Sequence, residues 1–445
     1  MEVDIMIKIS EKKALVRKNI KKEEKAAIEL AGAIWKLAEP PLKEKESSKL
    51  IARYLEANGF RVTWPFKMMP TAFMAERGSG KPVIGMLGEY DALPDCGEKP
   101  GTYGHGCGHN LLGVAPAVGA VAVGRILEQK GLKGKVVYWG CPAEETLVGK
   151  AYMARDGGFR DMDACLCWHP SSENSVRLSG GSALDSIVFE FKGRTSHAAA
   201  SPDKGRSALD AAILMDISVN YLREHVPEDV RIHSVICDGG KAPNVVPEYS
   251  RIWYYVRSKN REDVNNVSRR LKLCARGAAT ATETDVKITT LTAIYNRLPN
   301  QYMAKAVLDN FKLFGAPSVS PSDIERAEAL GNEAIFSRKI KTDIEEKQGR
   351  ASSDEDTVSW LAPLGGCSVA CVCRNTVVHH REYAMQTNLP FARKGMMRAA
   401  EVLAGTAVDL FNESKLLDKV VREFKSKTKG FRFDPLIPKN QRPQP

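Results

Sequence analysis

The stretch Gly104 to Asn110 places a thiol, Cys107, and an imidazole, His109, two positions apart among three glycines. Glycine removes side-chain bulk and permits positive φ, so this backbone can turn tightly and direct both donor atoms at one point. Thiolate and imidazole groups are common metal ligands. A Cys-x-His pair is equally compatible with an inert core thiol beside a structural histidine. The stretch therefore indicates part of a metal-binding site only if further ligands lie elsewhere in the chain.

Such ligands follow two apolar runs downstream and recur near the end of the chain. A hydrolytic site with two metal ions needs ligands for each ion, at least one bridging group, and a carboxylate that is not bound to metal. Glu144 and Glu145 are adjacent after a predicted strand, so one can face the ions while Glu144 faces the attacking water. The five candidate ligands are Cys107, His109, Glu145, His169 and one of His379 and His380.

Length and composition limit the class of protein to which these residues can belong. With 445 residues, the chain exceeds what one hydrophobic core usually supports, so we expect two domains. No apolar run approaches the roughly 20 residues of a membrane span, and residues 1–19 lack the core of a signal peptide. Ten dispersed cysteines do not resemble a disulfide framework. These features predict a cytoplasmic protein with reduced, mostly buried cysteines and no membrane partner.

The net charge of +11 raises the question of a nucleic-acid partner. The basic residues are dispersed and are densest at the two ends, in residues 11–24 and 415–432, where acids are mixed among them. Solvated helical faces are the usual explanation of such runs. We therefore expect no nucleic-acid binding.

Strands and helices alternate through the first 170 residues. Helices are predicted at 21–38, 44–58, 110–131 and 151–155, and strands at 60–64, 71–76, 82–88, 135–141 and 163–168. This order is typical of an α/β fold with a mainly parallel sheet between two layers of helices. Glu89, Asp91, Glu144, Glu145 and His169 each come just after the end of a predicted strand. Ligands bind at that edge of open α/β sheets.

The pattern changes at about residue 182. Strands at 184–191, 230–237, 252–256 and 285–293 and helices at 205–224 and 261–276 give the order β-α-β-β-α-β of a ferredoxin-like domain. We expect this domain, residues 183–295, to be inserted into a discontinuous catalytic domain formed by residues 1–182 and 296–445. The basic, proline-rich residues 425–445 are expected to lie on the surface.

Five motifs resemble, in order, those of the M20 metallopeptidase family. They span residues 88–94, 106–110, 142–145, 193–199 and 244–247. The resemblance extends over about residues 20 to 420 and is strongest to the aminoacylase and amidohydrolase branch of the family.

The resemblance implies a role for each matching position. Cys107, His109, Glu145, His169 and His379 fall on metal-ligand positions and Glu144 on the general base, while Asp91 matches a carboxylate that orients a ligand. His197, on the inserted domain, matches a histidine that reaches across a dimer interface toward the substrate carbonyl. Asn244 and Arg257 match residues of the inserted domain, or lid, that hold a polar or carboxylate group of the substrate. A homodimer through the inserted domain is therefore expected, with a heteromeric partner as the alternative.

Three departures from the family pattern affect this assignment. Glu89 stands where the commonest first motif has histidine, and Asn110 where the branch usually has aspartate. The closing segment, residues 375–380, replaces the usual Gly-Thr-Pro-x-His, so His379 is preferred over His380 without excluding it.

The reaction that the resemblance implies is metal-assisted hydrolysis of an amide bond, with two divalent ions per subunit. Thiolate and imidazole donors suit zinc, and the carboxylate also admits manganese. The expected substrate is an N-acyl or N-aroyl amino acid, including an aromatic acyl group on glutamate such as p-aminobenzoyl-glutamate. Two alternatives remain, namely a dipeptidase or N-deacylase that uses the same site, and a non-catalytic partner subunit that keeps only the fold.

Overall fold

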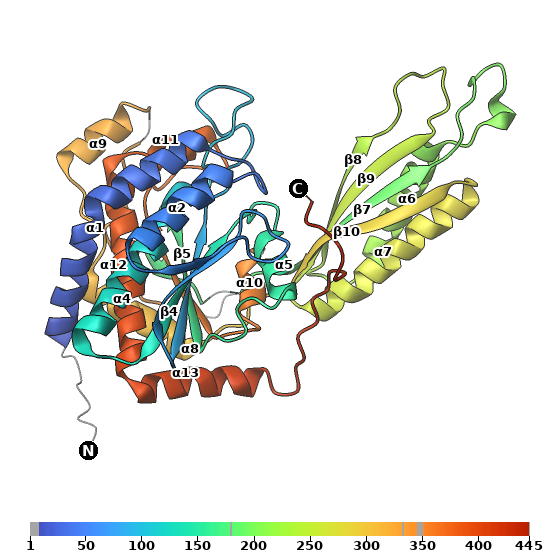
Figure 1. Ribbon diagram of the computed structural model, residues 1–445. Helices are drawn as coiled ribbons and strands as arrows, with labels where there is room; N and C mark the ends of the chain where they lie inside the picture. Colours follow the sequence, from blue (N-terminus) through green and yellow to red (C-terminus); the bar gives the residue numbers. More distant parts are fainter. Residues whose placement is uncertain (1–8, 179, 332, 345–348, 350, 445) are drawn as a thin grey trace.

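The computed structural model describes residues 9–178, 180–331, 333–344, 349 and 351–444. The described chain forms two sheets with their own helices, joined side by side in an elongated molecule (Figure 1). We call residues 183–294 the four-stranded unit and the remainder the seven-stranded unit. The predicted combination of a mainly parallel α/β sheet with a ferredoxin-like sheet is confirmed.

The larger sheet has the strand order β1-β2-β4-β3-β5-β11-β6. Its four central strands, β4, β3, β5 and β11, are parallel, and β1, β2 and β6 pair antiparallel at the two ends. The strands are β1 (Arg61–Thr63), β2 (Phe73–Ser79), β3 (Val83–Glu89), β4 (Gly134–Cys141), β5 (Ala164–Ser171), β6 (Ser175–Val176) and β11 (Leu364–Ala370). All seven residues of β3 are buried, as expected for a central strand covered on both faces.

Helices cover both faces of this sheet and enclose two cores. One face packs against α1 (Ile9–Leu37), α2 (Lys45–Ala57), α4 (Val114–Lys130), α8 (Gln301–Phe314) and α12 (Pro390–Asn412). The other face packs against α5 (Gly149–Arg155) and α10 (Glu355–Val358). The short helices α3 (His109–Leu112), α9 (Pro321–Glu328) and α11 (Arg381–Gln386) and the C-terminal α13 (Ser414–Lys427) complete this unit.

The stretch His109–Lys130, which contains α3 and α4, is long and apolar enough to cross a membrane. It is the central helical segment of the larger core instead, because 94% of its most apolar window is buried inside the protein. Helix α4 stops at Gly131, whose φ of +61° is a left-handed conformation that glycine adopts without strain.

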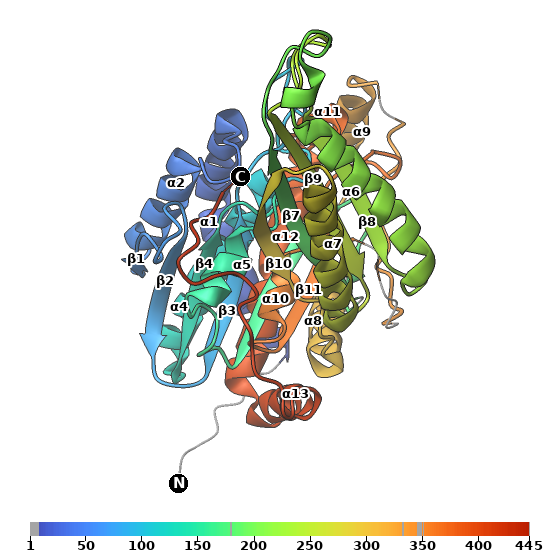
Figure 2. The same cartoon turned by 90° about the vertical axis from the view of Figure 1, so that its right-hand side faces the viewer.

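The four-stranded unit has strand order β10-β7-β9-β8, and all its pairs are antiparallel. Its elements are β7 (Ala183–Lys192), α6 (Ala208–Leu222), β8 (Arg231–Asp238), β9 (Tyr249–Ser258), α7 (Arg261–Ala281) and β10 (Asp285–Ile294), with short 3₁₀ turns at Pro202–Lys204 and Arg223–His225. Helices α6 and α7 begin at Ser207 and Asn260, whose side chains accept hydrogen bonds from backbone N–H groups of the first turn. Both helices pack on one face of the sheet (Figure 2).

One expectation drawn from the sequence is wrong, and another is incomplete. His169 lies within β5 rather than after it, because that strand continues to Ser171 by pairing with β11. Residues 425–444 are mostly exposed or half-buried, as expected for a surface segment, but the segment is anchored to the protein at particular residues. After α13 the chain runs back toward the four-stranded unit (Figure 1), where it buries Ile437 in the core under α5 and donates from Gln441 Nε2 to the carbonyl of Thr290.

Candidate active site

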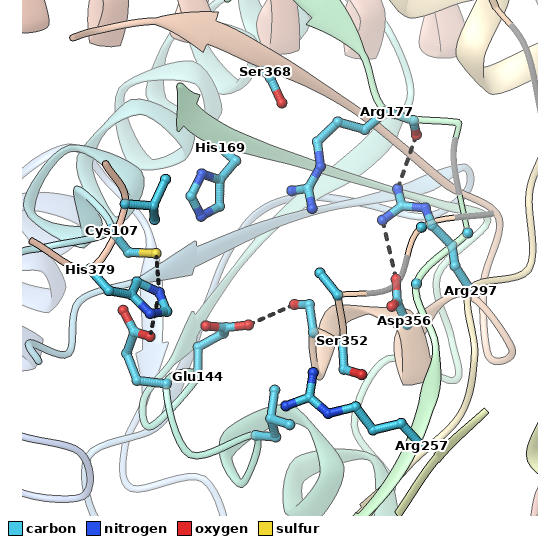
Figure 3. A pocket seen from close by; sticks show the side chains of 18 of the residues that line it. Cys107, Glu144, His169, Arg177, Arg257, Arg297, Ser352, Asp356, Ser368 and His379 are labelled. Carbon is cyan, nitrogen blue, oxygen red and sulfur yellow. Dashed lines mark hydrogen bonds and ion pairs between the residues drawn. The ribbon is translucent and has the colours of Figure 1, made fainter. Parts of the chain in front are cut away.

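Five loops and strand ends meet above the C-terminal edge of the parallel strands. Asp91 follows β3, His109 opens α3, Glu144 follows β4, His169 lies near the end of β5, and His379 precedes α11. Three of these residues, Glu144, His169 and His379, line a cavity of about 620 Å³ between the two units, together with Cys107, Glu145 and Arg257 (Figure 3). Asp91 and His109 are buried behind them. A concave site of this size is typical for a small-molecule ligand.

The glycine-rich loop of Cys107 packs directly against the loop of His379. Cys107 Sγ is 3.2 Å from His379 Nε2, and the backbone N–H of His379 donates to the carbonyl of Gly106 at 3.0 Å. A Cβ on Gly106 would lie 2.7 Å from Cys96 Sγ and 3.2 Å from His379 Cα, so only glycine permits this approach. His379 itself has a φ of +62°, a conformation that non-glycine residues rarely adopt. Its strained backbone directs the ring toward the thiol.

The carboxylate of Asp91 fixes two neighbouring groups. Its Oδ1 is 2.9 Å from His109 Nδ1, and its Oδ2 accepts from the backbone N–H of Glu145 at 2.9 Å. Burial disfavours a charged His109 ring, but Glu145 and Asp91 outweigh it and raise the pKa of His109 well above its usual value. With Nδ1 at Asp91, the other ring nitrogen, His109 Nε2, lies 3.4 Å from Glu89 Oε2 and 3.9 Å from Glu144 Oε2.

His109 Nε2 is buried and has no hydrogen-bond partner among the described residues. Around it, potential ligand atoms lie within 4.8 Å of one another in three overlapping groups: Cys107 with His109 and His169, Cys107 with Glu145 and His379, and Glu89 with His109 and Glu144. An orphaned imidazole nitrogen amid sulfur, nitrogen and oxygen donors fits a metal site, and imidazole with thiolate suits zinc in particular. Cys107 and His109 each belong to two of the three groups, so the groups form one continuous cluster of potential ligands.

Glu144 is oriented by a residue that sequence reasoning missed. Ser353 Oγ donates to Glu144 Oε1 at 2.7 Å, while Glu144 Oε2 is 3.9 Å from His109 Nε2. Burial, together with Glu89 and Asp354, raises the pKa of Glu144 well above its usual value. Burial likewise raises the pKa of Glu145 to about 7. Carboxylates in this environment would be stabilised by bound cations.

His169 completes the group from the opposite side of the cavity. Its Nδ1 is 2.6 Å from the carbonyl of Pro170, which leaves Nε2 as the nitrogen available to a metal. Burial and the nearby Arg177 lower the pKa of His169 to about 3, so the ring is neutral at physiological pH, as a ligand must be.

Of the two histidines of the closing segment, only His379 faces the cavity. His380 caps α11, where its Nδ1 accepts from the backbone N–H of Glu382, and its side chain is exposed. The helix cap gives a physical reason for a second histidine at this position.

His197 and Asn244 are not brought to the cavity of their own chain. Both are exposed and lie in the loops that leave β7 and β8 in the four-stranded unit, where Ala198 N donates to the carbonyl of Asn244. These loops form the tip of that unit farthest from the seven-stranded sheet (Figure 1). Arg257, in contrast, lies on β9 and lines the cavity.

A buried ion-pair cluster behind Glu144 was also missed. Lys150 is completely buried, and its Nζ lies 2.7 Å from Glu89 Oε1 and 2.5 Å from Asp354 Oδ1. A single lysine in the otherwise apolar residues 147–154 was the available sequence signal. Glu89, which stands where the commonest motif of the family has histidine, is thus paired with Lys150.

Comparisons with known proteins show the family and the fold of this chain. Residues 182–282 match the model of the M20 peptidase dimerisation domain. The chain is 35% identical to a subunit of the p-aminobenzoyl-glutamate hydrolase of Escherichia coli, over 94% of this chain and 95% of that protein. It is 30% identical to the mouse Xaa-Arg dipeptidase, over 89% and 88% of the two chains. A Bacillus subtilis protein described as a dinuclear metal binding peptidase from the M20 family shares the fold, with a TM-score of 0.55 at 17% identity over 87% of this chain and 99% of that one.

Proposed function

Because this chain belongs to the M20 family of metal-dependent peptidases and amidohydrolases, we propose that it hydrolyses the amide bond of N-acyl or N-aroyl amino acids at the cavity described above. The observation that carries the proposal is the buried Nε2 of His109, which has no hydrogen-bond partner among the described residues and whose ring belongs to two of the three ligand groups. A non-catalytic subunit that kept only the fold would not need such a set.

Five residues would hold two divalent ions: Cys107, His109, Glu145, His169 and His379. Zinc or manganese suits this mixture of sulfur, nitrogen and oxygen donors. When bound, such ions polarise the substrate carbonyl and lower the pKa of a water molecule. Asp91 keeps the His109 ring and the backbone of Glu145 in place for this task.

Glu144 is the proposed general base. Ser353 occupies its Oε1, so Oε2 is the oxygen that accepts the proton of the attacking water and later passes it to the leaving amine. The carboxylate lines the cavity, within reach of a substrate carbonyl placed between His169 and His379.

The protein is proposed to act as a homodimer through the four-stranded unit. The edge strand β8 exposes Val235 and Ile236, and α6 exposes Ile217 and Tyr221 on its outer side. An unpaired edge and an apolar surface are typical of an interface with a second chain. His197 and Asn244 of the second copy would then complete the site, with His197 at the substrate carbonyl oxygen. A heteromeric partner is the alternative, because the Escherichia coli relative is named as one subunit of its hydrolase.

The proposed substrates include p-aminobenzoyl-glutamate, from the name of the 35% identical relative. Arg257 supports this choice, since its guanidinium faces the cavity and can hold the α-carboxylate. A dipeptidase acting on peptides with a C-terminal arginine is the second candidate, because the mouse dipeptidase is 30% identical over most of its length. We also propose a cytoplasmic location, since ten free cysteines, most of them buried, suit a reducing compartment.

A hydrolysis panel tests the proposal. The protein, loaded with Zn²⁺ or Mn²⁺, is offered N-acetyl and N-benzoyl amino acids, p-aminobenzoyl-glutamate and Xaa-Arg dipeptides. We expect turnover of N-aroyl amino acids with the metal-loaded enzyme and loss of turnover with chelator. Preferential cleavage of Xaa-Arg dipeptides would favour the second candidate. No turnover of any member, with metal bound, would contradict the enzymatic proposal.

A further inference from the structure

Two arginines from different units face the cavity that contains Glu144 and His169. Arg177 follows β6 of the seven-stranded unit, and Arg257 lies on β9 of the four-stranded unit. Figure 3 shows both guanidinium groups directed into the cavity, that of Arg177 toward His169. A substrate bound between the units would therefore meet a cation on each side.

One terminal nitrogen of the Arg177 guanidinium is paired, and the other has no partner among the described residues. Its Nη2 is 2.8 Å from Glu355 Oε1, an oxygen that Arg297 Nη1 also contacts at 2.7 Å. Its backbone N–H donates to the carbonyl of Gly366, and its own carbonyl accepts from Arg297. Nη1, however, is buried without a hydrogen-bond partner among the described residues. Buried donors are nearly always paired in folded proteins, so a fixed guanidinium with a free donor points to an acceptor that the ligand supplies.

Arg257, on the four-stranded unit, also has a nitrogen without a partner among the described residues. Its Nε is buried without a partner, and within the described ranges no carboxylate lies at ion-pair distance from it. Its guanidinium carbon is 5.4 Å from the centre of the Tyr255 ring, which supports the cation without neutralising it. Asp356 lines the cavity too, but it lies 3.4 Å from Arg297 Nη1 and is paired there.

We propose that Arg177 binds a second carboxylate of the substrate, so that the amino acid released by this enzyme is acidic. Arg257 takes the α-carboxylate and Arg177 the side-chain carboxylate, since guanidinium groups bind carboxylates through charge-assisted, often bidentate hydrogen bonds. The same pair of cations would repel a lysine or arginine side chain at this position. This inference rests on the proposed function, because it assumes that the amide bond of an N-acyl amino acid is cleaved in this cavity.

The test compares two isosteric substrates, N-benzoyl-L-glutamate and N-benzoyl-L-glutamine, with the metal-loaded full-length protein. The wild type should prefer glutamate by at least ~10-fold in kcat/KM, because only that side chain carries the charge. In Arg177→Met the ratio should fall to within ~3-fold of unity, and in Arg177→Lys it should be intermediate, because charge remains without the planar fork. The exposed Arg381→Met is the matched control and should keep the wild-type ratio.

Arg257→Met should lower kcat/KM for both substrates and leave their ratio near the wild-type value, because both carry the α-carboxylate. A wild type that cleaves both substrates equally would overturn the proposal. It would also be overturned if Arg177→Met kept the preference for glutamate. The same holds if Arg257→Met, rather than Arg177→Met, lost that preference.

Binding separates this inference from the proposed reaction. Titration calorimetry of metal-loaded Glu144→Gln with the same two compounds measures recognition without turnover. Tighter binding of the glutamate compound, abolished by adding Arg177→Met, supports the inference even if the wild type hydrolyses neither compound. Equal binding of the two compounds contradicts it even if both are hydrolysed.

Discussion

The sulfur of Cys107 is surrounded by groups that bind metals, which an inert core thiol does not require. His379 Nε2 is 3.2 Å away, and Glu145 belongs to the same ligand group. Burial, and then Glu145, raises the pKa of the Cys107 thiol, so the thiolate that a ligand must be would need a cation beside it. Cys371, equally buried in the core around α12, has no such neighbours in the described ligand groups.

Removing the sulfur atom of Cys107 or of Cys371 should have different effects on metal binding. Cys107→Ala should bind less metal than the wild type, by at least ~10-fold in affinity, and should lose activity with it. Cys371→Ala removes a thiol of the same size from the core and should retain metal. Metal content after gel filtration, measured by atomic emission, checks both. Equal occupancy of the two variants would return Cys107 to the role of a core thiol.

The sequence predicted that cysteine, histidine and glutamate side chains gather near the strand ends, and the structure brings these candidates within 4.8 Å of one another in groups of three. Their role as metal ligands stays a prediction. His379 was preferred over His380 from the family motif, and the structure adds a reason that the sequence could not give, since His380 caps α11 and His379 has a left-handed φ. Ser353 could not be found either. A serine among the polar residues 352–356 gives no signal until folding brings it to 2.7 Å from Glu144.

At the scale of elements, apolar periodicity predicted most helices and strands to within a few residues. It failed where distant pairing or packing sets the boundary. Strand β5 continues past His169 because β11, nearly 200 residues later, pairs with it. Residues 425–445 were expected at the surface, and most of the described ones are exposed or half-buried, but Ile437 lies in the core under α5 and Phe433 packs against that core. Sequence-local patterns contain no information about such partners.

One ion-pair network connects three elements at the junction of the two units. Glu355 on α10 contacts Arg177 after β6 at 2.8 Å and Arg297, which follows β10, at 2.7 Å. Burial opposes ionisation of Glu355, but the two arginines outweigh it and lower its pKa to about 2. A depressed folded pKa means that the stabilisation is present above the ordinary value near 4.5 and is lost as pH falls toward 2.

Glu355→Gln should therefore destabilise the protein by ~3 kcal/mol or more at pH 7, because two buried guanidinium groups lose their shared carboxylate. The difference in Tm between wild type and variant should shrink on going from pH 7 to pH 3. The exposed Glu325→Gln serves as control and should change Tm little at either pH. A pH-independent difference for Glu355→Gln would show that the loss comes from packing rather than from charge.

At the scale of the whole molecule, the elongated arrangement explains why His197 and Asn244, which match residues of the family motifs, do not reach the cavity of their own chain. The unit tip that contains His197 and Asn244 points away from the seven-stranded sheet (Figure 1). The exposed edge of β8 offers a surface through which a second copy can bring these residues back. The sequence could suggest this only through the family motif, because exposure in one chain is visible only in three dimensions.

Complementation tests the dimer. His197→Ala and Glu144→Gln should each be inactive alone, and after subunit exchange a 1:1 mixture should regain about a quarter of wild-type activity. Half of the dimers are then mixed, and one of the two sites in each carries both wild-type residues. Exchange is verified by mass labelling, and His197→Ala mixed with itself is the control. An inactive mixture of exchanged subunits would show that His197 does not act across the interface.

The central claim is that Glu144 transfers protons at a site whose two ions are held by other residues. Metal stoichiometry and turnover of Glu144→Gln, measured on the same sample, test it most directly. The account predicts two ions per subunit, as in the wild type, with turnover lowered by ~100-fold or more, because the base is lost and no ligand is. A variant that keeps more than about a tenth of wild-type activity, or that loses its metal together with its activity, would contradict this assignment.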